Sequence, residues 1–180
     1  MLQITIPAVE YFDERTNTFM TTAGQTLQLE HSLVSLSRWE SRWKKPFLSQ
    51  EARTVEECRD YIRCMTITQN VDPLVYDNVT PEIYRQVDDY IEEPMTATWF
   101  NDTQKGPKSR EVITAEIIYY WMTALHIPFE CQKWHLNRLL ALIRVCDIKN
   151  SPRKKLSRKE IYNKNRELNE ARKKHLNTKG

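Results

Sequence analysis

The sequence contains very little glycine, which limits what its loops can bind. Only three glycines occur among the 180 residues: Gly24, Gly106 and Gly180. Neither GxGxxG nor GxxxxGK[ST] is present, and both motifs need glycine to bring the backbone close to a phosphate. We therefore expect no nucleotide cofactor, and no other pattern in the chain indicates a cofactor of another kind.

The chain also lacks the patterns typical of secreted and membrane-spanning proteins. Its four cysteines show no CxxC spacing, and its first residues lack the charged-then-apolar order of a secretory signal. The most apolar stretch, residues 112–125, is interrupted by Glu116 and is shorter than the roughly 20 residues that cross a bilayer. We expect a cytoplasmic protein with no membrane span.

No recognisable catalytic motif is present either. GxSxG and HExxH are both absent. His126, Cys131 and His135 lie within ten residues of one another, but their spacing matches no standard zinc signature. We interpret Cys131 as a small buried apolar group and the histidines as ordinary hydrogen-bonding groups. The sequence thus predicts no catalytic residue, no metal ligand and no enzymatic activity.

Charge is distributed unequally along the chain. Residues 151–180 carry eleven Lys and Arg against three Asp and Glu, whereas residues 1–150 carry 16 against 21. This asymmetry predicts a folded body over 1–150 and a basic interaction arm over 151–180, helical but mobile when alone. The arm's candidate partner-binding residues are Arg153, Lys154, Lys155, Arg158, Lys159, Arg172, Lys173 and Lys174. Their charge alone does not distinguish nucleic acid, an anionic membrane or an acidic protein.

The N-terminal residues predict a small antiparallel β element. Leu2, Ile4 and Ile6 alternate with polar residues, as in a half-buried strand. A turn at 13–17 would join a strand at 9–12 to another at 18–22. The segment 28–43 is ambiguous between strand and helix, and we expect it to be a strand first and a helix by Trp39.

Helical patterns dominate the rest of the body. Thr54 and Glu57 form a capping box, with Val55, Cys58, Ile62 and Met65 on one face of the helix that follows. Thr80 before Pro81 begins a second helix, which ends before Pro94.

Three later helices complete the predicted architecture. Ser109 would cap a nearly apolar helix that continues to Leu125 and lies centrally in the core. A further helix over 130–146, with Trp134 on it, would pack on that one. Ser157 and Glu160 would open a charged helix over 158–175. The predicted fold is α+β: a mainly helical body with a small N-terminal antiparallel β element and a C-terminal basic helical arm.

Trp39 and Trp43 form a candidate binding patch in the body. Basic residues surround them, and at positions i and i+4 of a helix both rings would share one face. Such a patch suits stacking on bases or anchoring a protein partner. Burial of the two rings in the core is the alternative.

Four stretches resemble a family of small bacteriophage proteins, the tail assembly chaperones of long-tailed phages. They are LQLEHSLVSLSRWESRWKKPFL (27–48), DYIRCMTIT (60–68), EIIYYWM (116–122) and FECQKWHLNRLLALIRVC (129–146). The resemblance implies a non-catalytic assembly factor of the host cytoplasm. Such a factor binds the tape measure protein and helps tail tube protein polymerise around it. It transfers no site residue, and self-association on a filamentous partner would be compatible with it.

Two alternatives remain open at this point. The chain could be an accessory protein that binds nucleic acid through the basic arm, or a structural connector or tail completion protein of the virion. Chaperones of the family that this chain resembles are often made in two lengths, the longer one through a programmed ribosomal frameshift. The sequence does not decide between the short and the long form.

Overall fold

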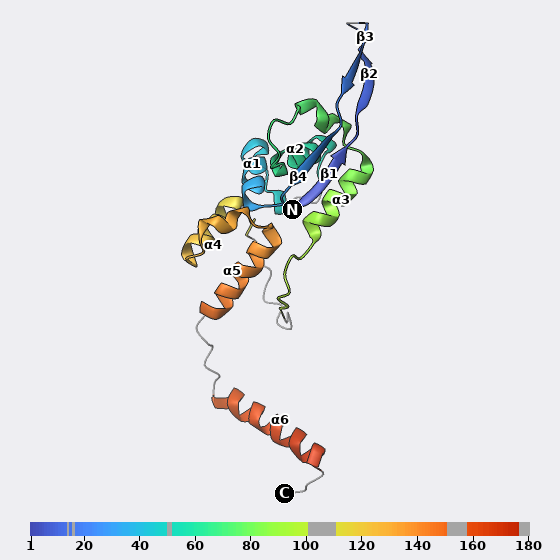
Figure 1. Cartoon of the computed structure of the whole chain (residues 1–180). Helices are drawn as coiled ribbons and strands as arrows, with labels where there is room; N and C mark the ends of the chain where they lie inside the picture. The colour runs from blue at the N-terminus through green and yellow to red at the C-terminus, as the bar shows by residue number, and fades with distance from the viewer. Residues whose placement is uncertain (14, 16, 50–51, 101–110, 151–157, 177–180) are drawn as a thin grey trace. The chain divides into compact units, whose positions relative to one another are not determined.

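The structure is a computed structural model that describes residues 1–13, 15, 17–49, 52–100, 111–150 and 158–176. The chain divides into two compact units, Met1–Asp147 and Ile148–Gly180. The first unit contains paired strands and a larger set of helices, and the second contains one long helix (Figure 1). The predicted α+β fold is confirmed.

Four short strands form two antiparallel pairs near the N-terminus. Strand β1 (Leu2–Ile6) pairs with β4 (Gln25–Leu29), and β2 (Val9–Asp13) pairs with β3 (Thr18–Thr22). In the first pair Ile4 lies opposite Leu27, and both side chains are buried. The alternation in the sequence therefore marks the core-facing side of β1 and β4. The second pair extends beyond the first, away from the helices of the first unit (Figure 1).

Gly24 lies where one strand pair gives way to the other. A Cβ atom at this position would lie 2.8 Å from the backbone nitrogen of Ala8 and 3.1 Å from the carbonyl oxygen of Ile6. Both distances are shorter than an ordinary carbon contact, so the close approach of the two chain segments requires glycine here.

The ambiguous segment 28–43 resolves into strand and then helix. Strand β4 ends at Leu29, and helix α1 spans Leu33–Trp43. Ser32 caps α1 through a reciprocal hydrogen-bonded box with Ser35, and the helix stops at Lys44, which adopts a left-handed conformation with φ of 55°. The helix thus begins earlier than Trp39, because the Ser32 hydroxyl accepts the Ser35 backbone amide in the first turn.

The capping signals of the next two helices are confirmed. Helix α2 spans Val55–Met65 and begins with the predicted box between Thr54 and Glu57. Helix α3 spans Pro81–Glu92 and is capped by Thr80. Of the residues predicted to share one face of α2, Ile62 and Met65 are buried, whereas Val55 in the first turn is 65% exposed.

Helix α4 is shorter than the sequence predicted. It spans Ala115–Ala124, and its N-cap residue Thr114 makes no side-chain capping bond. Ser109, the predicted cap, lies outside the described residues. The helix is also less central than expected, since Tyr120 is 68% exposed and burial is confined to one stripe of Ala115, Ile118 and Met122.

The predicted helix over 130–146 is wrong at both ends. A 3₁₀ helix spans Phe129–Lys133, and α5 runs over Leu136–Asn150. The two are separated because His135 forms a β-bridge with Ser32 and the Leu136 amide donates to the His31 carbonyl over 2.7 Å. These contacts hold residues 134–135 extended and place Trp134 outside the helix, at the surface.

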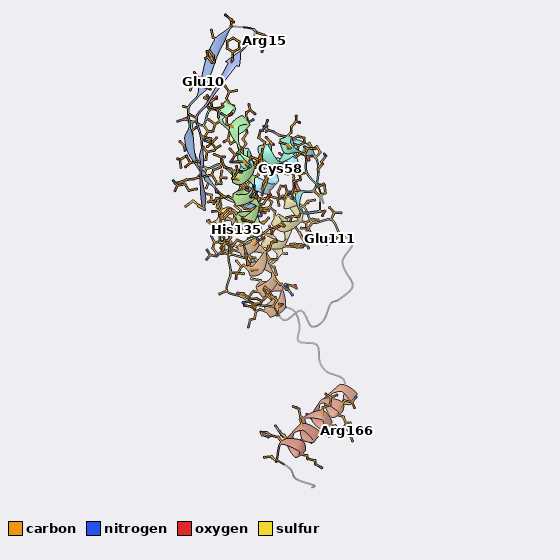
Figure 2. The ribbon with its side chains drawn as sticks, turned by 90° about the vertical axis from the view of Figure 1, so that its right-hand side faces the viewer. Glu10, Arg15, Cys58, Glu111, His135 and Arg166 are labelled. Atoms are coloured by element: carbon orange, nitrogen blue, oxygen red, sulfur yellow. The ribbon has the colours of Figure 1, made fainter. Side chains whose placement is uncertain are left out.

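The core of the first unit lies between the β1–β4 pair and helices α1, α2 and α3. Its fully buried large side chains include Leu27, Leu36, Trp39, Ile62 and Met65. Figure 2 shows His135 between this core and α5. The second unit consists of helix α6 (Arg158–Leu176), whose described bounds agree with the predicted helix. The predicted capping residue Ser157 lies outside the described residues.

Candidate partner-binding surfaces

Trp39 belongs to the core, so its assignment as a residue that contacts a partner is wrong. Its side chain is fully buried, and its indole nitrogen donates a hydrogen bond to the Glu57 carbonyl oxygen over 2.9 Å. The ring packs edge-on against Phe47, with 5.0 Å between ring centroids. The i, i+4 spacing does place Trp43 beside it, stacked at 6.1 Å.

Trp43 is partly exposed but held by an internal contact. Its indole nitrogen donates to Asp60 Oδ2 over 2.9 Å, and Arg42 forms an ion pair with the other oxygen of the same carboxylate. The basic residues around the two tryptophans are therefore partly engaged within the fold.

Lys45 provides a second example of such engagement. Its ammonium group lies 2.6 Å from Glu57 Oε1, while Glu57 Oε2 accepts the Thr54 backbone amide over 2.8 Å. The hydrogen bond from Lys45, followed by that from Thr54, lowers the pKa of Glu57 to about 2. This carboxylate joins the end of α1 to the start of α2.

The structure describes only part of the predicted basic arm. Arg153, Lys154 and Lys155 lie outside the described residues. Arg158 and Lys159 form the first turn of α6, and Lys174 lies in its last turn. Arg172 and Lys173 are exposed on the same helix. The charged groups of Arg172 and Lys173 are therefore accessible to an anionic partner.

An apolar groove between α4 and α5 is the feature that sequence analysis missed. Its volume is about 480 Å³, and its lining comes from both helices: Trp121, Ala124, Leu125, Leu140, Ile143, Arg144 and Asp147. The sequence predicted that the two helices would pack together. Instead they leave a groove between them, in which Trp121, Leu125 and Leu140 are only partly buried.

The groove has charge along one side only. Arg144 and Asp147 lie three residues apart on α5, whereas the lining residues from α4 are Trp121, Ala124 and Leu125. The Arg144 guanidinium lies 4.1 Å from the centre of the Phe100 ring. In the sequence, two neighbouring helices each carry apolar residues at helical spacing. This pattern does not distinguish a closed interface between the helices from an open groove.

The candidate metal cluster of the sequence is dispersed. Cys131 and His135 are buried, but His126 is exposed and adopts a left-handed backbone conformation. His135 Nε2 lies 2.9 Å from the Tyr90 carbonyl oxygen, and its Nδ1 accepts the Asn137 amide over 3.3 Å. Both ring nitrogens of His135 are therefore engaged. Among the described residues no group of three His, Cys, Asp or Glu could hold a metal ion.

His31 and Tyr61 form a second buried polar contact. His31 Nδ1 lies 2.6 Å from the Tyr61 hydroxyl, and the His31 and His135 rings meet edge-on at 5.1 Å. Burial, reinforced by His135 and Arg53, lowers the pKa of His31 to about 3. Burial also raises the pKa of Tyr61. Both groups are consequently neutral at physiological pH and act as hydrogen-bonding parts of the core.

Among the described residues, no helix combines the length and apolar character needed to cross a membrane. Comparisons of this chain with protein-family models, with curated proteins and with solved structures found no match.

Proposed function

We propose that this chain is a tail assembly chaperone of a long-tailed bacteriophage. In this role it binds the tape measure protein in the host cytoplasm and assists polymerisation of tail tube protein around it. The proposal rests on the resemblance of the four sequence stretches, and the structural observation that supports it best is the open apolar groove between α4 and α5.

The groove suits an amphipathic helix as its occupant. Helix-in-groove recognition uses a few apolar anchors at helical spacing, and they dock between two helices of the receptor. Trp121, Leu125 and Leu140 provide partly exposed apolar surface for such anchors. A tape measure protein is a long helical polypeptide in the family that this chain resembles, so it would present a partner of this kind.

The charge on the α5 side would orient the occupant. Arg144 and Asp147 both line the groove from α5, so a bound helix would align a complementary pair of charges there. Contacts of this exposed kind affect orientation and association rate more than affinity. Raising the salt concentration should therefore slow binding while the apolar contact persists.

The test is co-expression with the candidate tape measure protein, followed by co-purification. Ala124→Arg would fill the groove without removing a core atom, because Ala124 is exposed on the last turn of α4. Ala52→Arg, at an exposed residue outside the groove, is the matched control. We expect Ala124→Arg to abolish co-purification and Ala52→Arg to leave it intact. Failure of the unaltered chain to keep the tape measure protein soluble would contradict the proposal.

Nucleic-acid binding through the basic arm is the second candidate function, supported by the exposed Arg172 and Lys173 on α6. Clustered cations release counterions from phosphates, so such binding would weaken steeply with salt. A DNA mobility shift that is lost when the chain is truncated after Asn150 would favour this function over the chaperone role. Detection of the chain in mature purified particles would favour the virion connector.

A further inference from the structure

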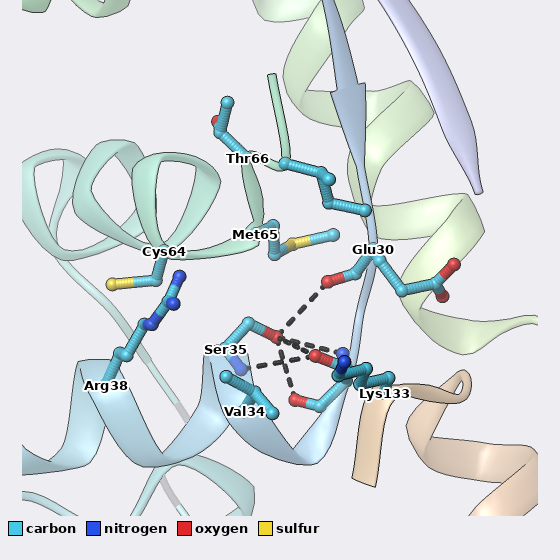
Figure 3. Close-up of a pocket in the computed structure, with 10 residues that line it drawn as sticks. Glu30, Val34, Ser35, Arg38, Cys64, Met65, Thr66 and Lys133 are labelled. Carbon is cyan, nitrogen blue, oxygen red and sulfur yellow. Dashed lines mark hydrogen bonds between the residues drawn. The ribbon is translucent and has the colours of Figure 1, made fainter. Parts of the chain in front are cut away.

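A cationic cleft lies between α1 and α2, on a body whose net charge is negative. It consists of two adjoining hollows of about 340 Å³ each, which share Arg38 and Cys64 in their lining. Arg42 and Arg63 complete the polar side of one hollow, and Lys133 lies at the other (Figure 3). We call the two hollows together the arginine cleft.

The carboxylates at this cleft already have partners. Asp60 pairs with Arg42 and accepts the Trp43 indole. The Glu30 carboxylate accepts the Tyr90 hydroxyl over 2.7 Å, and it points away from Arg38 (Figure 3). Neither carboxylate is therefore directed at the remaining cations of the cleft.

Three cations of the cleft consequently have no carboxylate partner among the described residues. They are Arg38, Arg63 and Lys133. Arg63 contacts the ring of Tyr76 at 5.0 Å and, at the limit of hydrogen bonding, the Pro73 carbonyl at 3.5 Å. Burial and the neighbouring Asp60 raise the pKa of Cys64 to about 11, so its thiol adds no negative charge at neutral pH.

Apolar surface lies between the cationic ends. Val34, Met65 and Ile67 line the hollow that Arg38 shares with Lys133, and Ile67 is half exposed. No aromatic ring lines either hollow among the described residues, whereas single-stranded nucleic acid is bound by aromatic stacking beside cations. The lining fits an apolar side chain flanked by carboxylates.

From this arrangement we propose that the arginine cleft binds an acidic segment of a protein partner. The carboxylates of that segment pair with Arg38, Arg63 and Lys133, and an apolar side chain of the segment lies against Val34 and Ile67. Arginine is suited to this task because its planar guanidinium forms two parallel hydrogen bonds with one carboxylate. The cleft and the α4–α5 groove share no lining residue, so this binding is independent of the proposed chaperone function.

The test measures fluorescence anisotropy of a fluorescein-labelled peptide in which pairs of glutamates flank single leucines. The full chain is compared with the double variant Arg38→Gln/Arg63→Gln. The control is Arg85→Gln/Lys149→Gln, which removes the same charge from exposed positions outside the cleft. Residues 151–180 are identical in all three proteins, so any binding by that basic segment is common to them. Thermal melts establish that each variant is folded.

We expect the cleft variant to raise the Kd by about tenfold or more, since it removes two charge-assisted contacts, and the control to change it little. Amide resonances of Ser35 and Ile67 should shift when the peptide is added to the unaltered chain. The Ala124→Arg variant should bind the peptide normally, which separates this inference from the chaperone function.

Three outcomes would overturn the inference. The first is an equal Kd for the cleft variant and the unaltered chain. The second is an equal loss in the control, which would reveal a response to net charge alone. The third is tighter binding of a single-stranded oligonucleotide with the same dependence on Arg38 and Arg63, which would assign the cleft to nucleic acid.

Discussion

The Glu40 side chain on α1 provides the acceptor for the first amide of α4, which begins 75 residues later in the sequence. Glu40 Oε2 accepts the backbone N–H of Ala115 over 2.7 Å, while Oε1 accepts the backbone N–H of Phe47 over 2.8 Å. Thr114, at the N-cap of α4, makes no side-chain capping bond. A carboxylate from another helix thus takes the place of a local cap and complements the positive end of the helix dipole.

Replacing Glu40 by glutamine should destabilise the first unit. The amide has one acceptor oxygen where the carboxylate has two, so one of the two buried backbone N–H groups would face an NH₂ group. An unsatisfied buried donor costs about 1–3 kcal/mol. Urea unfolding of Glu40→Gln should show a loss of this size. The control is Glu116→Gln, which changes an exposed carboxylate in the first turn of α4. Equal stability of the two variants would contradict the capping role.

The ion pair between Lys45 and Glu57 should contribute to stability in a defined pH range. The pKa of Glu57 is lowered to about 2 in the folded chain from an ordinary value of 4.5. A lowered carboxyl pKa favours the folded state above pH 4.5, and this contribution is lost as the pH falls towards 2. Lys45→Met should therefore weaken the pH dependence of unfolding below pH 4.5.

Denaturant unfolding at several pH values between 2 and 7 measures this effect. Lys44→Met is the matched control, because it removes the same charge from the exposed neighbouring residue. Parallel stability curves for Lys45→Met and the unaltered chain would show that another group stabilises the Glu57 carboxylate.

Local signals in the sequence predicted the starts of α2 and α3 well. Thr54 with Glu57, and Thr80 with Pro81, act within a single helical turn, so their effect is independent of the rest of the fold. The strands also followed their alternation, because one face of the β1–β4 pair is buried. Elements whose ends depend on short-range hydrogen bonds could thus be predicted.

The starts of α4 and α5 could not be predicted in the same way. The first depends on Glu40 from α1, and the second on the bridge between Ser32 and His135. Both contacts join residues far apart in the sequence. The burial of Trp39 and the open groove between α4 and α5 could not be predicted for a related reason. Burial of Trp39, and the openness of the α4–α5 groove, depend on how whole helices are placed, which helical spacing does not specify.

His31 should make the first unit sensitive to mild acid. Its pKa is lowered to about 3 from 6.5, first by burial and then by His135 and Arg53. Below pH 6.5 the unfolded chain binds a proton that the folded chain does not. The free energy of unfolding should fall by about 1.4 kcal/mol per pH unit from this group, down to about pH 3.

His31→Gln should remove that slope while lowering stability at pH 7 through loss of the contact with Tyr61. Chemical unfolding across about pH 5.5–7 measures both changes, above the range in which Glu57 titrates in the unfolded chain. The exposed His126 provides the control variant His126→Gln, which should retain the slope. If the slope persisted in His31→Gln, acid sensitivity would have to be assigned to another buried group.

Gly24→Ala should destabilise the junction between the two strand pairs. The added Cβ would lie 2.8 Å from the Ala8 nitrogen, and backbone atoms on both sides leave no flexible side chain to move aside. Overpacking of this kind costs about 1–3 kcal/mol. Ala23→Ser, at the exposed neighbouring residue, should cost much less. Urea unfolding gives both values. Hydrogen exchange should show faster exchange in β1 and β4 of the Gly24→Ala variant, because these strands lie on one side of the clash. Unchanged exchange together with unchanged stability would mean that the two segments can separate at no cost.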